Sequence, residues 1–209
     1  MNIRPQINAY IAAKILPLYE HFDKGHGSGH ARTVLRNSLE IVEEIAVEVD
    51  REMVYVIAAY HDIGLKFGRE NHEKNSAIEL LRDEKLREWF TAEQLATMAE
   101  AVEDHRASNS REPRSIYGKI VSEADRDIDY LTILTRTAQY STANFPELSP
   151  EQHFARSMEH FRAKYARGGY LRLWLETRRN REKLNEMQEI LDDEERVRED
   201  FLRILTENA

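Results

Sequence analysis

The dipeptide His61-Asp62 directly follows the most apolar segment of the chain, in the run Tyr60-His61-Asp62-Ile63-Gly64. A buried carboxylate without a partner is strongly disfavoured, so Asp62 should lie at a solvated helix end or beside an opposite charge. A bound metal ion is one such charge. Because imidazole nitrogens and carboxylate oxygens both bind divalent metals, the dipeptide is a candidate for two ligands of a metal site.

Further candidate ligands occur near other expected helix ends. They are His30, His72, His105 and Asp125, which make a set of six with His61 and Asp62. Side chains at the ends of different helices can converge on one centre, and adjacent residues on a helix point about 100° apart. Four ligands would hold one ion. All six, with Asp62 bridging, would hold two ions roughly 3.5–4 Å apart and generate a hydroxide nucleophile at neutral pH.

The amino-acid composition narrows the kinds of metal site and of partner. The 209 residues include no cysteine, which excludes disulfides, thiolate nucleophiles and Cys-based zinc or iron–sulfur sites. Any metal must therefore be held by His, Asp and Glu. Acidic residues outnumber basic ones by 38 to 30, a formal net charge of -8, so we expect no broad nucleic-acid surface.

Neither a secretory signal nor a membrane span is expected. The N-terminal region lacks a basic stretch followed by an apolar core and a small-residue cleavage site, and no apolar run approaches the 18 or so residues that span a bilayer. The sequence therefore predicts a cytoplasmic protein with no membrane partner.

Hydrophobic periodicity predicts an all-α fold of about nine or ten helices, because almost no segment alternates with the period of a strand. The expected helical segments are 7–22 with a kink or new start at Pro17, 28–45, 50–62, 77–81, 91–105, 116–134, 149–168 and three further pieces within 171–205. Segment 50–62 has little polar face, so we expect it to be the central buried helix.

Capping residues indicate where several helices begin. Thr91 to Gln94 has the form of a capping box, as does Ser149 to Gln152, in which Pro150 takes the first helical position. Ser28 and Asp50 are the expected N-caps of two earlier helices. Segment 107–115 is rich in Ser, Arg, Asn and Pro and is expected to be a loop.

The domain organisation is expected to be simple, since no convincing Pro/Gly/Ser linker divides the chain. We expect one domain over 1–209, with a core at about 20–140 and a helical extension at about 150–209. The turn region 145–150 is the candidate seam between them.

Three motifs, in this order, resemble the HD-domain superfamily of metal-dependent phosphohydrolases. They are His30-Ala31-Arg32-Thr33-Val34 at a helix start, Ala58-Ala59-Tyr60-His61-Asp62-Ile63-Gly64 at a helix end, and Glu123-Ala124-Asp125-Arg126-Asp127, and the similarity covers about 26–135. The resemblance implies an HD-domain-like helical bundle with His30, His61, Asp62 and Asp125 as metal ligands. In binuclear members two further histidines hold a second metal, and His72 and His105 occupy those places.

Two departures from known branches of this superfamily leave the substrate open. After Gly64 the chain continues Leu65-Lys66, so it lacks the extended motif of the cyclic-dinucleotide phosphodiesterases. No segment resembles the synthetase of alarmone enzymes, and the region after 150 matches no motif of the superfamily. The resemblance therefore implies a reaction class without a substrate.

A phosphorylated substrate requires positive charge near the metal. Lys66 and Arg106 lie within a few residues of an expected ligand, so we expect them to contact the substrate phosphate. Asp62 is expected to take part in catalysis, and Glu70 and Glu73 are candidates for a proton-donating or water-orienting acid. The other histidines are interpreted as non-ligands: His21, His153 and His160 at surface or capping positions, and His26 in a loop at the entrance.

The leading hypothesis is a phosphohydrolase that uses one or two divalent ions, of Mn, Fe, Ni, Co, Zn or Mg, to cleave a phosphomonoester or phosphodiester. Its partner would be a small phosphorylated substrate, with a nucleotide as one candidate. Two alternatives stay open: a di-iron oxygenase, which the six-ligand set also resembles, and a non-catalytic nucleotide- or metal-sensing module. Segment 184–205 is interpreted as a packing or dimer surface, so a homodimer is a candidate state.

Overall fold

The computed structural model describes residues 3–23, 25–106, 111–126, 128–175 and 177–207, and these residues form ten α-helices and no strand. The prediction of an all-α fold is therefore confirmed. Among the same residues, no helix combines the length and the apolar character that crossing a membrane requires. The contacts divide the chain into two compact units, Met1–Arg126 and Asp127–Ala209.

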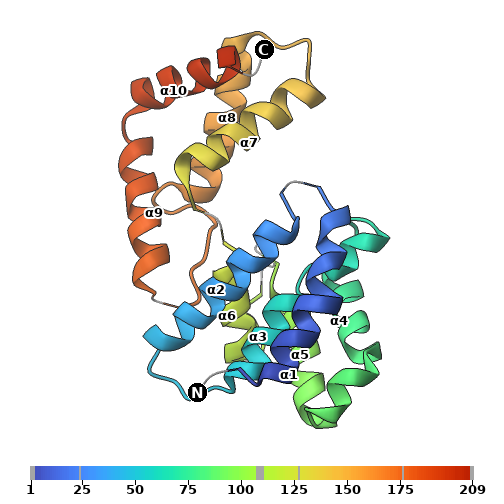
Figure 1. Cartoon of the computed structure of the whole chain (residues 1–209). Coiled ribbons are helices and arrows are strands. Elements are labelled where there is room, and N and C mark those ends of the chain that lie inside the picture. The colour runs from blue at the N-terminus through green and yellow to red at the C-terminus, as the bar shows by residue number, and fades with distance from the viewer. Residues whose placement is uncertain (1–2, 24, 107–110, 127, 176, 208–209) are drawn as a thin grey trace. The chain divides into compact units, whose positions relative to one another are not determined.

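The first unit contains α1 to α6 and four shorter turns of helix (Figure 1). In chain order its elements are α1 (Pro5–Tyr10), η1 (Ile11–Ile15), η2 (Leu16–His21), α2 (Ser28–Glu44), α3 (Arg51–Tyr60), η3 (Ile63–Phe67), α4 (His72–Arg82), η4 (Glu84–Glu88), α5 (Ala92–Asp104) and α6 (Ile116–Ala124). The break expected at Pro17 is found as a change of helix type: a π-helical turn ends at Ile15, and Pro17 lies in the first turn of the 3₁₀ helix η2.

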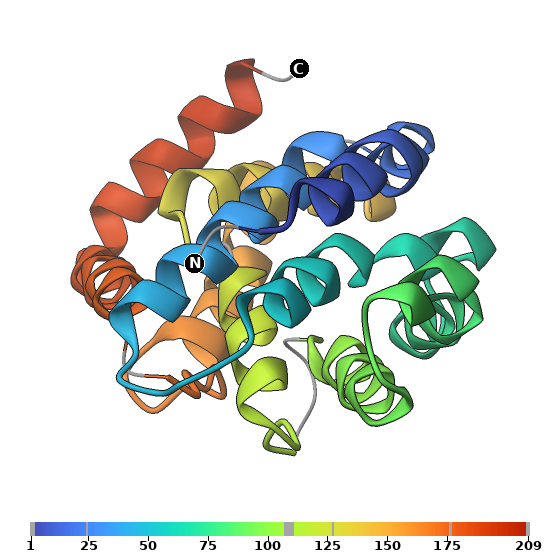
Figure 2. The same cartoon turned by 60° about the horizontal axis from the view of Figure 1, so that its bottom comes forward.

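Helix α3 is the central helix of the first unit, as its apolar sequence predicts. Seven of its ten residues are buried, and it packs against α2, α4, α5 and α6 (Figures 1 and 2). The Asp50 carboxylate caps its start by accepting from the backbone N–H groups of Glu52 and Met53 over 2.9 and 3.3 Å. Because α3 is buried and ends at Tyr60, the next two residues, His61 and Asp62, lie in the middle of the unit.

Most of the expected caps are found. The Thr91–Gln94 capping box opens α5 with both of its reciprocal hydrogen bonds formed. The expectation for α2 is wrong by one residue: Gly27 is the N-cap and Ser28 is the first helical residue, with no side-chain hydrogen bond at this cap. The backbone of Gly27 is extended, with ψ of -177°, and the helix begins at the next residue.

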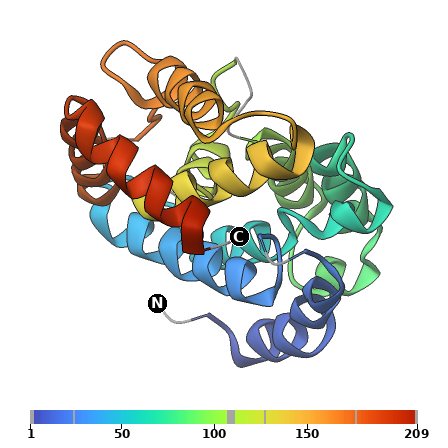
Figure 3. The same ribbon diagram turned by 90° about the horizontal axis from the view of Figure 1, so that it is seen from above.

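The second unit contains α7 (Tyr130–Asn144), α8 (Pro150–Tyr165), α9 (Arg178–Leu191) and α10 (Glu194–Glu207). Helix α10, red in Figure 3, packs against α7, α8 and α9. The unit boundary falls after Arg126, ahead of the seam expected at 145–150. The reason is that the apolar face of α7, with Ile133 and Leu134, is buried in one cluster with residues of α8, α9 and α10.

Segment 171–175 is not helical, contrary to its expected helical character. Backbone hydrogen bonds from Tyr170 to Ala163 and from Leu171 to Lys164 fold this segment back on the end of α8. Its leucines, Leu171 and Leu173, then pack against the core of the second unit from a non-helical backbone. The apolar spacing therefore reflects burial and not helical periodicity.

Candidate metal centre

Six side chains from the ends of five helices meet inside the first unit. His30 is the third residue of α2 and His72 is the first residue of α4, whereas His61, His105 and Asp125 are the C-caps of α3, α5 and α6. Asp62 follows His61 and precedes η3. The structure therefore brings together all six residues that the sequence suggested as metal ligands, and they fall into two groups of three.

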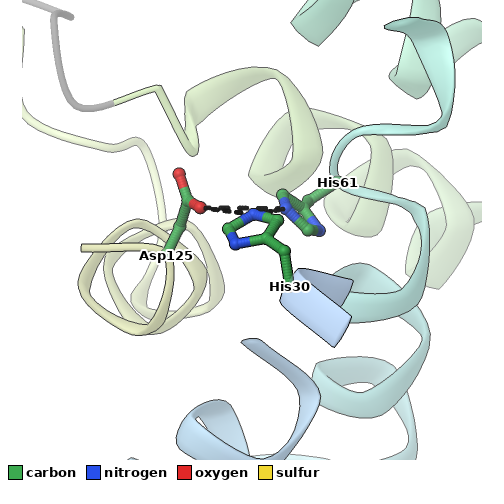
Figure 4. Close-up of side chains that lie close together, drawn as sticks. All are labelled: His30, His61 and Asp125. Carbon is green, nitrogen blue, oxygen red and sulfur yellow. Dashed lines mark hydrogen bonds and ion pairs between the residues drawn. The ribbon is translucent and has the colours of Figure 1, made fainter. Parts of the chain in front are cut away.

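The first group is His30, His61 and Asp125, whose side chains point toward one another in Figure 4. His30 Nε2 lies 3.1 Å from Asp125 Oδ1 and 3.1 Å from His61 Nε2, and His61 Nε2 lies 3.8 Å from Asp125 Oδ1. Ligand atoms bound about 2.1 Å from one ion stand about 3 Å apart when their bonds are perpendicular. The spacing of this group therefore matches the first shell of a single metal ion.

The second group is Asp62, His72 and His105. Asp62 Oδ1 lies 3.3 Å from His72 Nε2 and 3.4 Å from His105 Nε2. His105 and Asp62 are almost fully buried, and the His72 side chain is 14% exposed. This group thus forms a second compact set of donors beside the first.

Asp62 faces both groups, one with each carboxylate oxygen. While Oδ1 faces the second group, Oδ2 lies 3.4 Å from His61 Nε2 and 3.7 Å from His30 Nε2. A carboxylate can bridge two metal ions only if its two oxygens are directed to separate positions. The orientation of Asp62 meets this requirement.

Backbone carbonyls orient three of the four histidines. Nδ1 of His61 lies 2.8 Å from the Ala58 carbonyl oxygen, that of His72 3.0 Å from Arg69, and that of His105 2.6 Å from Val102. A carbonyl oxygen only accepts, so each Nδ1 must carry the proton and donate it. Each Nε2 therefore faces the centre and presents a lone pair there once any proton on it is displaced, which is the tautomer that a metal ligand needs.

The carboxyl groups of Asp62, which is buried, and Asp125, which is partly buried, both have a lowered pKa and are ionised. Burial alone raises the pKa of Asp62, but the charge of His61 and hydrogen bonds from His105 and the other histidines hold that pKa well below its ordinary range. Burial likewise acts to raise the pKa of Asp125, but the hydrogen bond from His30 and the charges of His61 and His105 together lower it. Burial favours neutral His105, but Asp62 outweighs it and raises the pKa of His105 to about 9.

This electrostatic pattern fits a cation-binding site. The centre holds two carboxylates whose charge must be balanced by protonated imidazoles or by metal ions, and metal binding to histidine displaces the proton. Imidazole nitrogens with carboxylate oxygens are donors for Zn²⁺, Mn²⁺, Fe²⁺, Co²⁺ and Ni²⁺, so the residues fit one or two divalent ions without selecting one metal.

Comparison with known protein families agrees with this geometry. Residues 27–128 match the family model of the HD domain. The chain belongs to the HD-domain superfamily. All six convergent residues lie within the HD domain so defined. Searches of curated proteins and of solved structures found no match to the chain.

The four polar residues expected to contact substrate occupy different surroundings in the HD domain. Glu73 follows His72 and is buried, and its Oε2 lies 3.6 Å from Nη1 of Arg106, which is about half exposed. Lys66 is paired with Glu79 of α4, and its ammonium lies 4.9 Å from the centre of the Phe67 ring. Glu70 is exposed in the turn before α4. Of the four, Glu73 contacts a histidine of the second group, with Oε2 3.5 Å from His72 Nδ1, and Arg106 contacts Glu73.

The remaining histidines differ in part from their interpretation. His21 and His160 are exposed, as expected. His26 lies beside the HD centre, with its ring 5.9 Å from that of His30 and its Nδ1 2.9 Å from Asp23 Oδ1. The surface interpretation of His153 is wrong: it is buried in the second unit, where its Nδ1 lies 2.7 Å from Ser141 Oγ.

Sequence reasoning missed Tyr19, which orients the central dipeptide of the HD domain. Its hydroxyl donates to the Ala59 carbonyl over 2.9 Å and accepts from the Asp62 N–H over 3.2 Å, and its ring stacks on that of His61 at 6.1 Å. Burial raises the pKa of Tyr19, so the hydroxyl stays protonated and can donate. In the sequence Tyr19 is one more large residue on an apolar helical face, and no local signal sets it apart.

Asn37 and Gly64 also position ligands. The Asn37 amide on α2 donates to the Ala124 carbonyl over 3.0 Å and so ties α2 to the end of α6, where Asp125 follows. Gly64 lies so close to α4 that a Cβ there would come within 2.2 Å of the His72 carbonyl oxygen. The sequence indicated Gly64 as a helix stop, whereas the structure shows that its lack of a side chain admits the helix that carries His72.

Proposed function

We propose that the chain is a metal-dependent phosphohydrolase that cleaves a phosphomonoester or phosphodiester of a small molecule, with nucleotides among the candidate substrates. The orientation of Asp62 carries this proposal. Its two oxygens are directed to two histidine-containing groups, which is the arrangement expected of a pair of divalent ions. Membership of the HD-domain superfamily supports hydrolysis as the reaction class.

The chain's own residues would prepare the centre for this reaction. His30, His61 and Asp125 would hold one ion, and His72 and His105 another, with Asp62 shared between them. Divalent ions in these positions would supply a nucleophile at neutral pH by lowering the pKa of water, and would neutralise charge that develops on the phosphoryl oxygens. The carbonyls of Ala58, Arg69 and Val102 keep the histidines in the ligating tautomer.

Arg106 and Lys66 are proposed to bind the substrate phosphate. Arg106 follows the ligand His105, and its side chain is 46% exposed, so N–H groups that do not face Glu73 can reach a bound anion. Lys66 is 37% exposed and would have to leave Glu79 to do the same. Glu70 is the proposed proton donor, because its exposure leaves it accessible to a leaving group, whereas Glu73, the other expected acid, is buried beside Arg106.

The test is hydrolysis of a panel of phosphorylated metabolites with added Mn²⁺, Co²⁺, Ni²⁺ or Mg²⁺, using protein purified without chelator. We expect phosphate release from at least one substrate, and loss of both activity and metal in Asp62→Ala. The control variant is Asp192→Ala, which removes an exposed carboxylate of the second unit and should change neither. Full activity and full metal content in Asp62→Ala would remove the proposal.

A di-iron oxygenase is the second candidate function. The observation that favours it is the donor set, four histidines and two aspartates with one carboxylate facing both groups. Oxygen uptake that requires ferrous iron, without release of phosphate, would identify this activity. Specific nucleotide binding without turnover would instead identify a non-catalytic sensor.

A further inference from the structure

Glu73 and Arg106 follow the two histidines of the second group and contact each other. Glu73 is the second residue of α4, next to His72, and Arg106 follows His105 at the end of α5. Arg106 Nη1 lies 3.6 Å from Glu73 Oε2. One ion pair therefore joins the residues that directly follow the two histidines of the second group. These residues are 33 positions apart in sequence.

The Glu73 carboxylate is buried next to His72, so the pair can affect a histidine of the second group as well as join two helices. Glu73 is only 8% exposed, and its Oε2 has no hydrogen-bond partner among the described residues. The same oxygen lies 3.5 Å from His72 Nδ1, whose proton is donated to the Arg69 carbonyl, so Glu73 faces the His72 ring as a nearby negative charge and not as a hydrogen-bond acceptor. A buried carboxylate is stable only beside compensating charge, and here the nearest groups are the Arg106 guanidinium and the His72 imidazole.

A carboxylate behind a ligating histidine is a known way to strengthen a metal site. Its negative charge makes the metal-facing nitrogen a better electron donor, and loss of such an outer partner typically costs 10- to 100-fold in metal affinity. At His72 the Arg69 carbonyl holds the ring orientation, and Glu73 supplies the charge. The first group is held by other contacts, such as the Ala58 carbonyl behind His61 and the Asn37 amide at the end of α6. The two metal positions should therefore respond to different substitutions.

We propose that Glu73 and Arg106 are a positioning pair for the second metal position, and that their ion pair decides whether the chain holds two ions or one. This inference rests on the proposed function only in requiring that the two groups bind metal. Glu73 acts through His72, and Arg106 acts through Glu73. Neither residue is assigned as a metal ligand.

The test counts metal ions in the full-length chain. Wild type and variants are loaded with Mn²⁺ and dialysed, bound ions are measured by elemental analysis, and magnetic coupling between neighbouring Mn²⁺ ions is followed by electron paramagnetic resonance. We expect two coupled ions in wild type. Glu73→Gln and Arg106→Gln should each keep one uncoupled ion and bind a second at least about tenfold more weakly.

A matched control is Glu52→Gln. Glu52 is 17% exposed and pairs with Arg4, which is 47% exposed, so this pair matches the exposure of Glu73 and Arg106, at 11% and 46%, but it has closer hydrogen bonds and touches no metal-site histidine. It should keep two coupled ions. Arg106→Lys retains the positive charge and should hold the second ion more tightly than Arg106→Gln. Circular dichroism checks that each variant folds. If Glu73→Gln unfolds, the comparison of Arg106→Gln with Arg106→Lys still tests the inference, because Arg106 is half exposed and its substitution should not unfold the protein.

The outcomes separate this inference from the proposed function. Two ions bound with unchanged affinity in both Glu73→Gln and Arg106→Gln overturn the inference and leave the phosphohydrolase intact. The inference is supported if wild type binds two ions and these variants bind one. If the wild-type protein with two ions then cleaves no phosphoester, the proposed function is refuted and the inference stands. A single ion or none in wild type, or equal weakening by Glu52→Gln, overturns the inference.

Discussion

The Tyr19 hydroxyl accepts a hydrogen bond from the backbone N–H of Asp62 over 3.2 Å, although the two residues are 43 positions apart. The same hydroxyl donates to the Ala59 carbonyl, and Tyr19 is fully buried. The Ala59 carbonyl belongs to the end of α3 and the Asp62 N–H to the turn that follows, so the hydroxyl joins the helix end to the residue whose carboxylate faces both groups. The aromatic residue of η2 thus completes the hydrogen bonding of a backbone that the metal centre depends on.

Tyr19→Phe should destabilise the protein and loosen this turn. It removes one hydroxyl and leaves the buried Ala59 carbonyl and Asp62 N–H without their partner, which costs about 1–3 kcal/mol for such a group. Urea unfolding of the metal-free protein measures the loss, and titration with Mn²⁺ should show weaker binding. Unchanged stability and unchanged metal affinity together would contradict the role of Tyr19 in positioning Asp62.

The metal-free protein should lose stability in alkaline solution because of His105. Its pKa is raised from an ordinary value of 6.5 to about 9 in the folded protein. The folded state therefore binds this proton more tightly than the unfolded state, so the stabilisation is complete below about pH 6.5 and is lost as the pH rises through about 9. The difference amounts to on the order of 3 kcal/mol.

Urea unfolding at pH 6.5 and 9.5, after chelation, checks this pH dependence. His105→Asn cannot bind the proton, so its free energy of unfolding should fall much less over the same interval. An equal fall in both proteins would show that another group is responsible. Because metal binding must displace the His105 proton, metal affinity should also increase with pH over this range.

Gly64→Ala should displace α4 and weaken the second metal position. The added Cβ would lie 2.2 Å from the His72 carbonyl oxygen and 2.5 Å from the Ser76 nitrogen, and both are backbone atoms that cannot rotate away. Overpacking of this kind costs about 1–3 kcal/mol. Thermal unfolding and the count of bound Mn²⁺ ions measure the two effects.

Gly29→Ala is the control for Gly64→Ala. A Cβ at Gly29 meets no atom within 4 Å, and the residue lies in the first turn of α2 beside His30. Removing a helical glycine there should stabilise the protein by about 0.5–1 kcal/mol. If both alanine variants lowered the melting temperature equally, close approach to α4 would not be the reason for glycine at position 64.

Asn37→Ala should weaken the first metal position more than the second. It removes the amide that donates to the Ala124 carbonyl, next to Asp125, and the carbonyl left unpaired costs about 1–3 kcal/mol. Its neighbour Ser38 is equally buried, but its hydroxyl has no hydrogen-bond partner among the described residues. Ser38→Ala should therefore be neutral or stabilising. Competitive metal titration and urea unfolding of the two variants test this contrast.

Local sequence was sufficient for most features that depend on neighbouring residues, although the N-cap of α2 is Gly27 and not Ser28. The Asp50 cap and the capping boxes at Thr91 and Ser149 form as expected, because each joins groups two or three residues apart. The apolar face of segment 50–62 likewise predicted the buried central helix. The same reasoning failed at 171–175, where Leu171 and Leu173 are partly buried against the core by a backbone that folds back on α8.

By itself, the sequence determined the all-α class, the membership of the HD-domain superfamily and the six candidate ligands at helix ends. Only the tertiary structure decided how these six divide into two groups, that Asp62 faces both, and that Tyr19, Asn37 and Gly64 position them. It also decided that the boundary between the two compact units falls after Arg126. The physical reason is range: capping and periodicity act within one or two helical turns, whereas these contacts join residues from distant parts of the chain and exist only once the helices pack.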